Sequence, residues 1–437
     1  MKSARRLIER YLPQGGLRRS VSIIAGGTAL AQGIAIAVTP IITRLYQVDD
    51  FGYFQVFISI MGVLAVVVAG RYETAVPIPE DDDSALNLAA FALCTVIAVC
   101  VLVGMVILIA IHIPWIILRS GKLLGYLWLL PVCLAGAGFY QVFSYWSLRK
   151  KDYALVARTR VIQVSTRFVM QLGAGVLGFG LPGLLVSEAV ARANGSGNFF
   201  RGFRRRYWHL VTQIRPRKMR EVALRYKQFP LVFSASGILN SAALALPTLL
   251  LAAFFGATVT GWFALVNRVL GIPTVLVGQS LQQVYLSEGA PLIHENPVAL
   301  RGLFEKMIRK VYLIPLITCT FLVIFGPAVF SFAFGAKWRE AGEYARILAF
   351  VDVVGLLVAP IDMTLTMLEL LNWRFAWDCG RLILVGAAMF LAHYFFTGPE
   401  PVIYAYAGSM MVGYAALLIM SYLGINRLIA ARAALAD

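Results

Sequence analysis

Charged residues are scarce in this chain. Only 14% of its 437 residues are Asp, Glu, Lys or Arg, and 59% are apolar, whereas soluble domains have about 25% charged and about 45–50% apolar residues. A soluble protein could not bury this much apolar surface, so the composition excludes one. Charge is absent altogether from residues 21–43, 51–70, 84–118, 123–148, 311–336, 382–399 and 402–426.

The residues that usually catalyse reactions or bind metals are also few. The cysteines form no CxxC pair, and their odd number argues against a disulfide framework; they are Cys94, Cys100, Cys133, Cys319 and Cys379. The four histidines are scattered, so neither a zinc site nor a Cys/His nucleophile is visible. G-x-S-x-G, H-E-x-x-H and a phosphate-binding glycine loop are missing. We therefore expect that the protein is not an enzyme and that it binds no metal and no cofactor. Any transport would be passive or coupled to a gradient, with protons or sodium as candidate coupling ions.

The apolar stretches predict an all-α polytopic membrane protein with about twelve transmembrane helices. A spanning helix needs about 20 apolar residues, and only a helix satisfies every backbone group within one segment in lipid. The run 228–267 is long enough for two passages with a turn near Gly256. The predicted helices cover 20–44, 51–71, 85–113, 123–148, 154–178, 180–200, 228–253, 257–283, 311–334, 344–370, 376–397 and 401–424, and the fifth, sixth and tenth carry internal charge.

Lys and Arg gather in alternate loops, which sets the orientation. One set holds the basic lead-in 1–19, residues 149–151, the segment 201–227, Lys306, Arg309, Lys310, Arg427 and Arg432; the other holds only Arg44, Arg119, Lys122, Lys337 and Arg339. Both termini are therefore predicted to be cytoplasmic. The predicted organisation is the lead-in 1–19, an N-lobe 20–200, a basic cytoplasmic linker 201–227, a C-lobe 228–424 and a cytoplasmic tail 425–437.

The linker has two interpretations. Its sequence, "RGFRRRYWHLVTQIRPRKMREVALRYK", has the basic composition of a nucleic-acid-binding segment. A basic segment next to a membrane helix is also typical of contact with anionic lipid, and this second interpretation is strongly favoured.

The two predicted lobes resemble each other. "TPIITRLYQVDDFGYF" (39–54) and "LPTLLLAAFFGATVTGWF" (246–263) each close one helix and open the next. Pro40 precedes Gly52 at nearly the distance by which Pro247 precedes Gly261. With six helices in each lobe, both copies start on the same side, which is a parallel repeat. Two such lobes with a substrate cleft between them are typical of transporters.

Polar side chains line one face of the predicted helix 154–178. Arg160, Gln163, Arg167 and Gln171 recur at i, i+3, i+7 and i+11, which places them together. A charge at membrane depth costs several kcal/mol and normally faces a cavity or a partner. The stripe predicts a water-filled cationic cavity that receives an anion. The alternative is a structural pair between an arginine and an acid on another helix.

The C-lobe repeats this theme with Arg268 in the middle of a predicted helix and Asn240 in the preceding one. Asn240 is suited to hydrogen-bond a sugar or, at least as well, another helix. We place both residues in the substrate-binding set.

The remaining intramembrane acids are gate or coupling candidates. Glu188 and Arg192 (i, i+4) can neutralise each other, as can Asp378 and Arg381 (i, i+3); this structural interpretation is slightly favoured. Two other acids lack a nearby basic residue on the same helix, and they either pair with Arg167 or Arg268 or carry a coupling proton. They are Asp352 and Asp362.

An acidic run interrupts this basic, apolar chain in "GRYETAVPIPEDDDSALNLAA" (70–90). Asp82, Asp83 and Ser84 are predicted to cap the following helix, whose N-terminal dipole favours negative charge. Capping leaves Arg71 and Glu73 unexplained. This stretch resembles the signature of bacterial oligosaccharide and O-antigen flippases, the polysaccharide-transporter branch of the multidrug/oligosaccharidyl-lipid/polysaccharide exporter superfamily. "AGGTALAQGIAIAVTPIITRLYQVDDFGYF" and "LVARTRVIQVSTRFVMQLGAGVLGFGLPGLLVSEAV" resemble the same family.

The resemblance implies a V-shaped, MATE-like bundle of two six-helix lobes in the bacterial cytoplasmic (inner) membrane. It implies transfer of undecaprenyl-pyrophosphate-linked oligosaccharide to the outer leaflet by alternating access, for surface polysaccharides such as lipopolysaccharide and exopolysaccharide. The pyrophosphate requires a cationic cavity, and Arg71 with Glu73 is predicted to form a gate at its cytoplasmic mouth. The partners expected are this lipid-linked oligosaccharide, membrane lipids and the polysaccharide polymerase and export machinery, with no nucleic acid.

Other functions remain open from the residues alone. A multidrug/cation antiporter of the same superfamily would favour an acidic cavity, and a peptidoglycan-precursor flippase would use the same cationic chemistry. A glycan polymerase or ligase would need a large outer loop, which is missing from the sequence. A scaffold without transport activity would not need arginines at membrane depth.

Overall fold

The computed structural model describes residues 16–110, 112 and 121–436, so most of the predicted lead-in 1–19 lies outside it. Within these ranges all regular structure is helical, which confirms the predicted fold class. The chain divides into two compact units. Unit 1 contains Met1–Asp50 and Phe57–Ile238, and unit 2 contains Phe51–Val56 and Leu239–Asp437.

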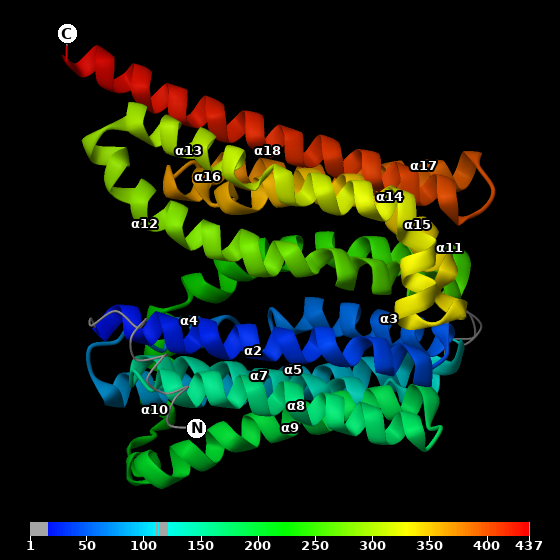
Figure 1. Cartoon of the computed structure of the whole chain (residues 1–437). Coiled ribbons are helices and arrows are strands. Elements are labelled where there is room, and N and C mark those ends of the chain that lie inside the picture. The colour runs from blue at the N-terminus through cyan, green and yellow to red at the C-terminus, as the bar shows by residue number, and fades with distance from the viewer. Residues whose placement is uncertain (1–15, 111, 113–120, 437) are drawn as a thin grey trace, which may run out of the picture. The chain divides into compact units, whose positions relative to one another are not determined.

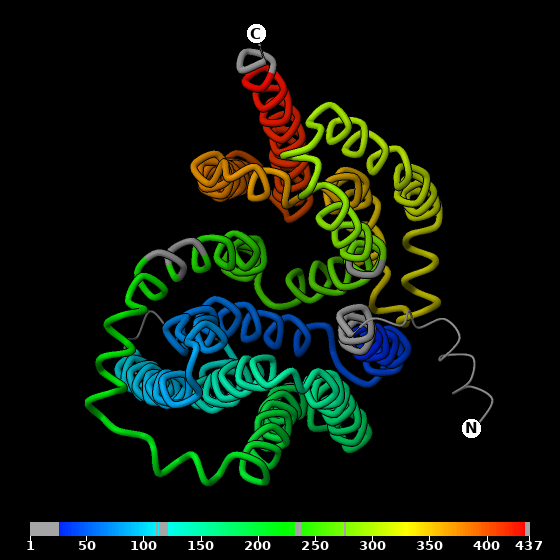
Figure 2. Tube along the Cα trace, turned by 90° about the vertical axis from the view of Figure 1, so that its left-hand side faces the viewer, coloured from blue at the N-terminus to red at the C-terminus, as the bar shows by residue number. Residues whose placement is uncertain are grey.

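Unit 1 is a layered bundle of long helices. Helix α8 packs against α2 and α9, and α7 packs against α9 and α5 (Figure 1). Figure 2 views these helices nearly end-on. The elements are α2 (Gly16–Leu45), α3 (Val48–Ala65), α4 (Tyr72–Ala75), α5 (Asp82–Ala110), η1 (Gly121–Tyr126), α7 (Leu129–Arg149), α8 (Tyr153–Val176), α9 (Gly180–Tyr207), η2 (Trp208–Gln213), α10 (Pro216–Arg225) and η3 (Phe229–Phe233).

Unit 2 contains the remaining helices, except that residues 234–238 at the start of α11 belong to unit 1. Helix α15 packs against α14 and α18, α17 against α18, and α12 against α13. The elements are α11 (Ser234–Pro273), η4 (Thr274–Gly278), α12 (Gln279–Glu295), α13 (Pro297–Val311), α14 (Leu313–Phe334), η5 (Ala336–Trp338), α15 (Arg339–Val358), η6 (Ala359–Ile361), α16 (Thr364–Met367), α17 (Leu371–Phe395) and α18 (Pro399–Ala436).

The turn predicted near Gly256 is present. Helix α11 is broken there, because Gly256 adopts φ 79° and ψ −168°, a conformation that is accessible essentially to glycine alone. The helix after this break continues through the π-helical turn η4 into α12 and ends at Glu295, well beyond the predicted residue 283. Helix α18 likewise continues to Ala436, so most of the predicted tail is helical.

The chain is a multi-pass membrane protein. A helix occupies most of each of the twelve predicted ranges, and eight segments of the described chain are long and apolar enough to cross a bilayer. Helices α7, α8 and α9 are not among these eight. Two of them are the fifth and sixth predicted helices, whose internal charge lowers their hydropathy. The count of twelve crossings stays a prediction.

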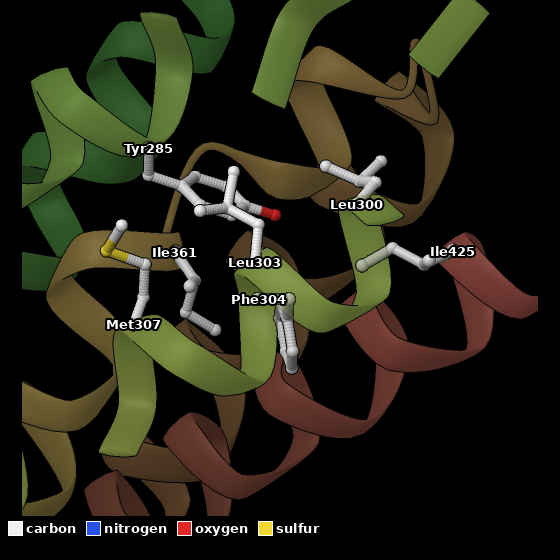
Figure 3. Close-up of a cluster of buried hydrophobic side chains, with 7 residues drawn as sticks. All are labelled: Tyr285, Leu300, Leu303, Phe304, Met307, Ile361 and Ile425. Atoms are coloured by element: carbon white, nitrogen blue, oxygen red, sulfur yellow. The ribbon is translucent and has the colours of Figure 1, made fainter. Parts of the chain in front are cut away.

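A buried hydrophobic cluster joins α13 to α12 and α18 in unit 2. Phe304 and Met307 of α13 are at most 2% exposed, and they lie beside Tyr285 of α12 (Figure 3). Since burial of one such side chain is worth about 1.5–3 kcal/mol, this cluster holds α13 firmly against the bundle. Lys306, Arg309 and Lys310 of α13 belong to the loop set predicted to be cytoplasmic.

The acidic run is a connector, and the capping prediction for it was wrong in detail. Asp81, not Asp82 or Asp83, accepts a hydrogen bond from the backbone N–H of Ser84 at 2.7 Å, and this bond holds the pKa of Asp81 below its usual value. Asp82 instead pairs with Arg149 at 3.1 Å. The capping role falls to the residue just before the helix, because only there does the side chain reach the free N–H groups.

The last acid of this run holds the linker. Asp83 pairs with Lys218 of α10 at 2.5 Å, and Asn87 of α5 accepts from the backbone N–H of Arg215 at 2.8 Å. Val222 and Ala223 of α10 are buried, and α10 packs against α5. The central part of the linker is therefore a docked piece of unit 1.

Residues 51–56 pack within unit 2 although they open α3. Phe51 makes an edge-to-face contact with Trp338, with ring centroids 5.4 Å apart. Gly52 lies so close to α11 that a Cβ atom at this position would be 1.8 Å from the carbonyl oxygen of Ala257. The contact requires glycine because no side chain fits between the two backbones.

We expect Gly52→Ala to destabilise the protein by about 1–3 kcal/mol, because the added methyl group forces the two backbones apart. The matched control is Gly62→Ala in the same helix, where an added Cβ meets nothing within 4 Å and alanine favours the helix by about 1 kcal/mol. Thermal unfolding in detergent, followed by tryptophan fluorescence, measures both. Equal melting temperatures for the two variants would contradict the prediction.

Candidate transport site

Arg167, Glu188 and Arg192 form a charge cluster inside unit 1. Glu188 of α9 is 1% exposed. Arg167 of α8 has its Nε atom 2.6 Å from Oε2 of Glu188, and Arg192, one turn further along α9, has its Nε atom 2.6 Å from Oε1. One carboxylate therefore contacts two guanidinium groups, and the cluster carries a formal charge of +1.

Local sequence brings this cluster together. A Cβ atom on Gly136 of α7 would lie 2.9 Å from Cβ of Arg192, so glycine is what allows α7 to approach α9 here. Two amide–hydroxyl hydrogen bonds continue the polar contact between α8 and α9. Asn194 donates to Thr166 at 2.7 Å and Asn198 to Thr159 at 2.6 Å. These four residues were not predicted from the sequence, although they recur at helical spacing on the facing sides.

Two interpretations of Arg167 were predicted, an anion-binding cavity and a structural pair with an acid, and the structure has features of both. Arg167 pairs with an acid on another helix, as the structural alternative required, and it shares that acid with a second arginine. Its side chain is 28% exposed, so the residue as a whole is not fully buried, although its Nε atom is. The within-helix pair of Glu188 and Arg192 is present as predicted. Binding of an anion by this cluster stays a prediction.

The rest of the predicted α8 stripe is divided between buried and exposed positions. Gln171 is 3% exposed, and its carbonyl oxygen accepts a hydrogen bond from the Tyr46 hydroxyl at 2.6 Å. Gln163 lies against Gly195 of α9. Arg160 is exposed at the other end of the stripe. Only Arg167 of the four reaches the charge cluster.

A second charge cluster lies in unit 2 and centres on Arg374, which was not predicted from the sequence. Its Nη1 atom is 3.0 Å from Oδ1 of Asp362, and its Nε atom is 3.4 Å from Oδ2 of Asp378. Asp378 also contacts Arg381, the predicted within-helix pair, at 3.5 Å. The spacing of Arg374 and Asp378, i and i+4, was the signal that could have revealed this residue.

An aromatic ring and an amide complete the cluster in unit 2. The guanidinium groups of Arg374 and Arg381 lie 4.9 Å and 4.4 Å from the ring centroid of Trp377, which is cation–π distance. Asn240 accepts a hydrogen bond from Arg381 at 3.1 Å, so Asn240 makes the contact with another helix that was one of its two predicted roles. With two acids and two arginines, the cluster is formally neutral.

Asp352 lies apart from both clusters and faces a cavity. The cavity has a volume of about 230 Å³ and lies between α11, α15 and α18. The Thr274 hydroxyl donates to Oδ1 of Asp352 at 3.3 Å. Asn267, Tyr406 and Tyr414 also line the cavity, and none of the lining residues that the structure describes is Lys or Arg. Arg268 follows Asn267 on α11 and is half-buried.

Arg71 and Glu73 are held by an unusual backbone. Gly70 and Arg71 both adopt left-handed conformations, with φ of 61° and 60°, which is uncommon for a residue other than glycine. The turn places Glu73 in the interior with 2% exposure, while the guanidinium of Arg71 lies against Gly237. Burial raises the pKa of Glu73, opposed by a backbone hydrogen bond and the charge of Arg71. Within the described chain no ion pair shorter than 4.0 Å joins these two residues, and the gate stays a prediction.

We expect Glu73→Gln to stabilise the protein at pH 8. Burial favours the protonated form of Glu73. The wild-type native state is therefore least stable at pH values above the folded-state pKa of Glu73, and it gains stability as the pH falls through that pKa. The variant's melting temperature should exceed wild type by about 2 °C at pH 8, and the difference should vanish toward pH 4. Glu80→Gln, in the exposed part of the same loop, is the control. A variant less stable than wild type at pH 8 would show that the carboxylate is the favoured form.

The fold is that of known multidrug transporters. The chain matches an inward-facing multidrug resistance MATE family transporter of the MOP superfamily with a TM-score of 0.73, at 16% identity over 93% of this chain and 96% of that one. The outward-facing form matches with 0.62, at 15% identity over 94% and 96%. A MOP superfamily transporter from Pyrococcus furiosus, described by the reverse polarity of its binding pocket, matches with 0.55, at 16% identity over 94% and 96%. The predicted MATE-like helical fold is confirmed.

The family follows from the sequence itself. Residues 41–343 match the profile of the polysaccharide biosynthesis protein family, and the chain belongs to that family. It is also 24% identical over 208 residues to the teichuronic acid biosynthesis protein TuaB of Bacillus subtilis (strain 168). That match spans 48% of this chain and 42% of TuaB. The resemblance found from the acidic signature is thereby confirmed.

Proposed function

We propose that this protein is a flippase that moves undecaprenyl-pyrophosphate-linked oligosaccharide from the inner to the outer leaflet of the bacterial inner membrane. The family supports a role in polysaccharide biosynthesis, and the fold supports transport by alternating access. In this proposal no covalent bond changes, both termini are cytoplasmic, and the product passes to polymerase and export machinery.

The observation that carries the proposal is the excess positive charge of the Arg167–Glu188–Arg192 cluster. Two guanidinium groups share one buried carboxylate, so one positive charge is left without a counter-ion in the cluster. A pyrophosphate supplies that counter-ion, and arginine is suited to bind it through paired hydrogen bonds. Arg167 is the residue proposed to contact the substrate, because its side chain is more exposed than that of Arg192.

Glu188 has a different role in this proposal. Arg167 and Arg192 would repel each other without the carboxylate between them, and lipid would not screen that repulsion. Glu188 thus holds both guanidinium groups in place while leaving the net charge positive. Arg268 remains a second proposed anion contact on α11, and Arg71 with Glu73 remains the proposed cytoplasmic gate.

We expect Arg167→Gln to reduce flipping at least tenfold, because the charge-assisted hydrogen bonds to the pyrophosphate are lost. Purified protein in liposomes is given a labelled undecaprenyl-pyrophosphate oligosaccharide in one leaflet, and a membrane-impermeant reagent reports its arrival in the other. The control is Arg158→Gln, an exposed arginine on the same helix.

Four outcomes separate the alternatives in this assay. Loss in Arg167→Gln but not in Arg158→Gln supports the proposal. Wild-type flipping that survives in Arg167→Gln moves the anion site to Arg268 or elsewhere. Wild-type protein that moves only a peptidoglycan precursor would identify the related flippase, and protein that moves neither would reject lipid-linked saccharides as the substrate.

A multidrug/cation antiporter is the second candidate, and the Asp352 cavity favours it. This cavity contains a carboxylate and hydroxyl groups but no basic side chain among its described lining residues, so it is suited to a cation. In a flippase the same acid can couple substrate movement to protons or sodium.

We expect Asp352→Asn to abolish stimulation of flipping by an imposed proton or sodium gradient while leaving flipping without a gradient within about twofold of wild type, because the coupling cation loses its carboxylate. The comparison is made in the same liposomes with and without the gradient. The control is Glu340→Gln, which removes an exposed acid at the start of the same helix. Stimulation that persists in Asp352→Asn would exclude this residue from coupling. Gradient-driven efflux of a cationic dye by the protein, instead of flipping of the lipid-linked oligosaccharide, would favour the antiporter.

A further inference from the structure

A groove with two arginines lies between α14 and α15, in unit 2 and outside both charge clusters. It has a volume of about 550 Å³ and is lined by Ile324, Pro327, Ala328, Ser331, Phe332, Arg339 and Arg346. This volume is within the range of small-molecule sites, about 300–1,000 Å³. No residue used in the proposed transport mechanism belongs to it.

The two arginines lie on one face of α15. They are seven residues apart, which corresponds to two helical turns and about 10 Å along the helix. Arg339 is exposed at the first position of α15. Arg346 lies deeper, where its Nη1 atom donates to Glu343 at 2.8 Å and its Nη2 atom to the carbonyl oxygen of Ile324 at 3.3 Å. Glu343 neutralises Arg346, so the excess positive charge of the lining residues is the single charge of Arg339.

Arg346 has hydrogen-bonding capacity to spare. Its Nε atom is buried and has no hydrogen-bond partner in the part of the chain that the structure describes. Within the part of the chain that the structure describes, Arg339 makes no ion pair of 4.0 Å or less.

The other wall of the groove is apolar and faces lipid. Ile324 and Phe332 of α14 are 56% and 85% exposed, and eight residues separate them, or about 12 Å along the helix. Ile317 and Phe321, further down the same helix, are also largely exposed. A hydrocarbon chain that leaves the groove along α14 therefore stays on apolar surface.

We infer that this groove binds an anionic phospholipid, with its phosphate at Arg339 and Arg346 and an acyl chain along Ile324 and Phe332. Charge selects the headgroup, because two guanidinium groups line the groove and none of its lining residues is acidic. Position selects a membrane lipid over a soluble anion, because the polar end of the groove is where α14 ends and α15 begins, at one boundary of the apolar spans.

The experiment titrates the purified full-length protein in detergent with phosphatidylglycerol and with phosphatidylcholine of the same acyl chains, and native mass spectrometry counts the lipids retained. Wild type is expected to prefer phosphatidylglycerol about tenfold. Arg339→Gln with Arg346→Gln should abolish this preference. The control is Arg309→Gln with Lys310→Gln, which removes the same charge from exposed positions on α13 and should leave the preference unchanged.

A steric variant keeps the test independent of charge and of folding. Ala328→Trp fills the groove from an exposed position on α14 and should reduce retention of both lipids while both arginines remain. Melting temperatures within about 2 °C of wild type, or about 1 kcal/mol of stability or less, establish that the variants fold. If the double arginine variant does not fold, Ala328→Trp decides alone.

Three results would overturn the inference. An unchanged preference in Arg339→Gln with Arg346→Gln, together with unchanged retention of both lipids in Ala328→Trp, would place the lipid elsewhere. Displacement of the lipid by millimolar glycerol phosphate would show a site for soluble phosphate. Displacement by undecaprenyl pyrophosphate, together with loss of flipping in the double variant, would make the groove part of the substrate path.

Discussion

The cost of an unpaired charge in lipid governs both units of this protein. A charged side chain at membrane depth needs an opposite charge, a polar cavity or an aromatic face. Each acid of the two charge clusters lies beside an opposite charge, and the acid of the cavity lies beside polar groups. Glu188 takes two arginines, Asp362 and Asp378 share Arg374, and Asp352 faces a hydroxyl-lined cavity. The units differ in the balance that results. The cluster in unit 1 keeps one positive charge, and the cluster in unit 2 is neutral.

Because the two clusters differ in net charge, the two units have different roles in the proposed mechanism. A cluster with surplus positive charge is suited to hold an anionic head group, whereas a neutral network of arginines around Trp377 mainly ties α17 to α11 through Asn240. The cavity at Asp352 adds a negative site to unit 2. An anionic substrate and a coupling cation would then bind in separate units, each within a region of suitable charge.

Local signals made much of the fold predictable. Uncharged runs located the helices, and Gly256 located the break in α11 because few other residues tolerate its backbone conformation. Pairs within one helix, such as Glu188 with Arg192, follow from spacing alone. Contacts between helices do not. Spacing placed Arg167 on a polar face but could not reveal that Glu188 of α9 lies opposite it, and Arg374 was overlooked because its pairing with Asp362 depends on the turns η6 and α16 between α15 and α17.

The acidic run also has a consequence for how the chain is made. Asp82 contacts Arg149, and Asp83 contacts Lys218, so the first turn of α5 receives its partners only after a further 67 and 135 residues have been synthesised. Until then four adjacent carboxylates, residues 80–83, stand at the start of a membrane helix, and Asp82 and Asp83 lack these basic partners. The last of these contacts cannot form before α10 has been synthesised, and at that point most of unit 2 does not yet exist.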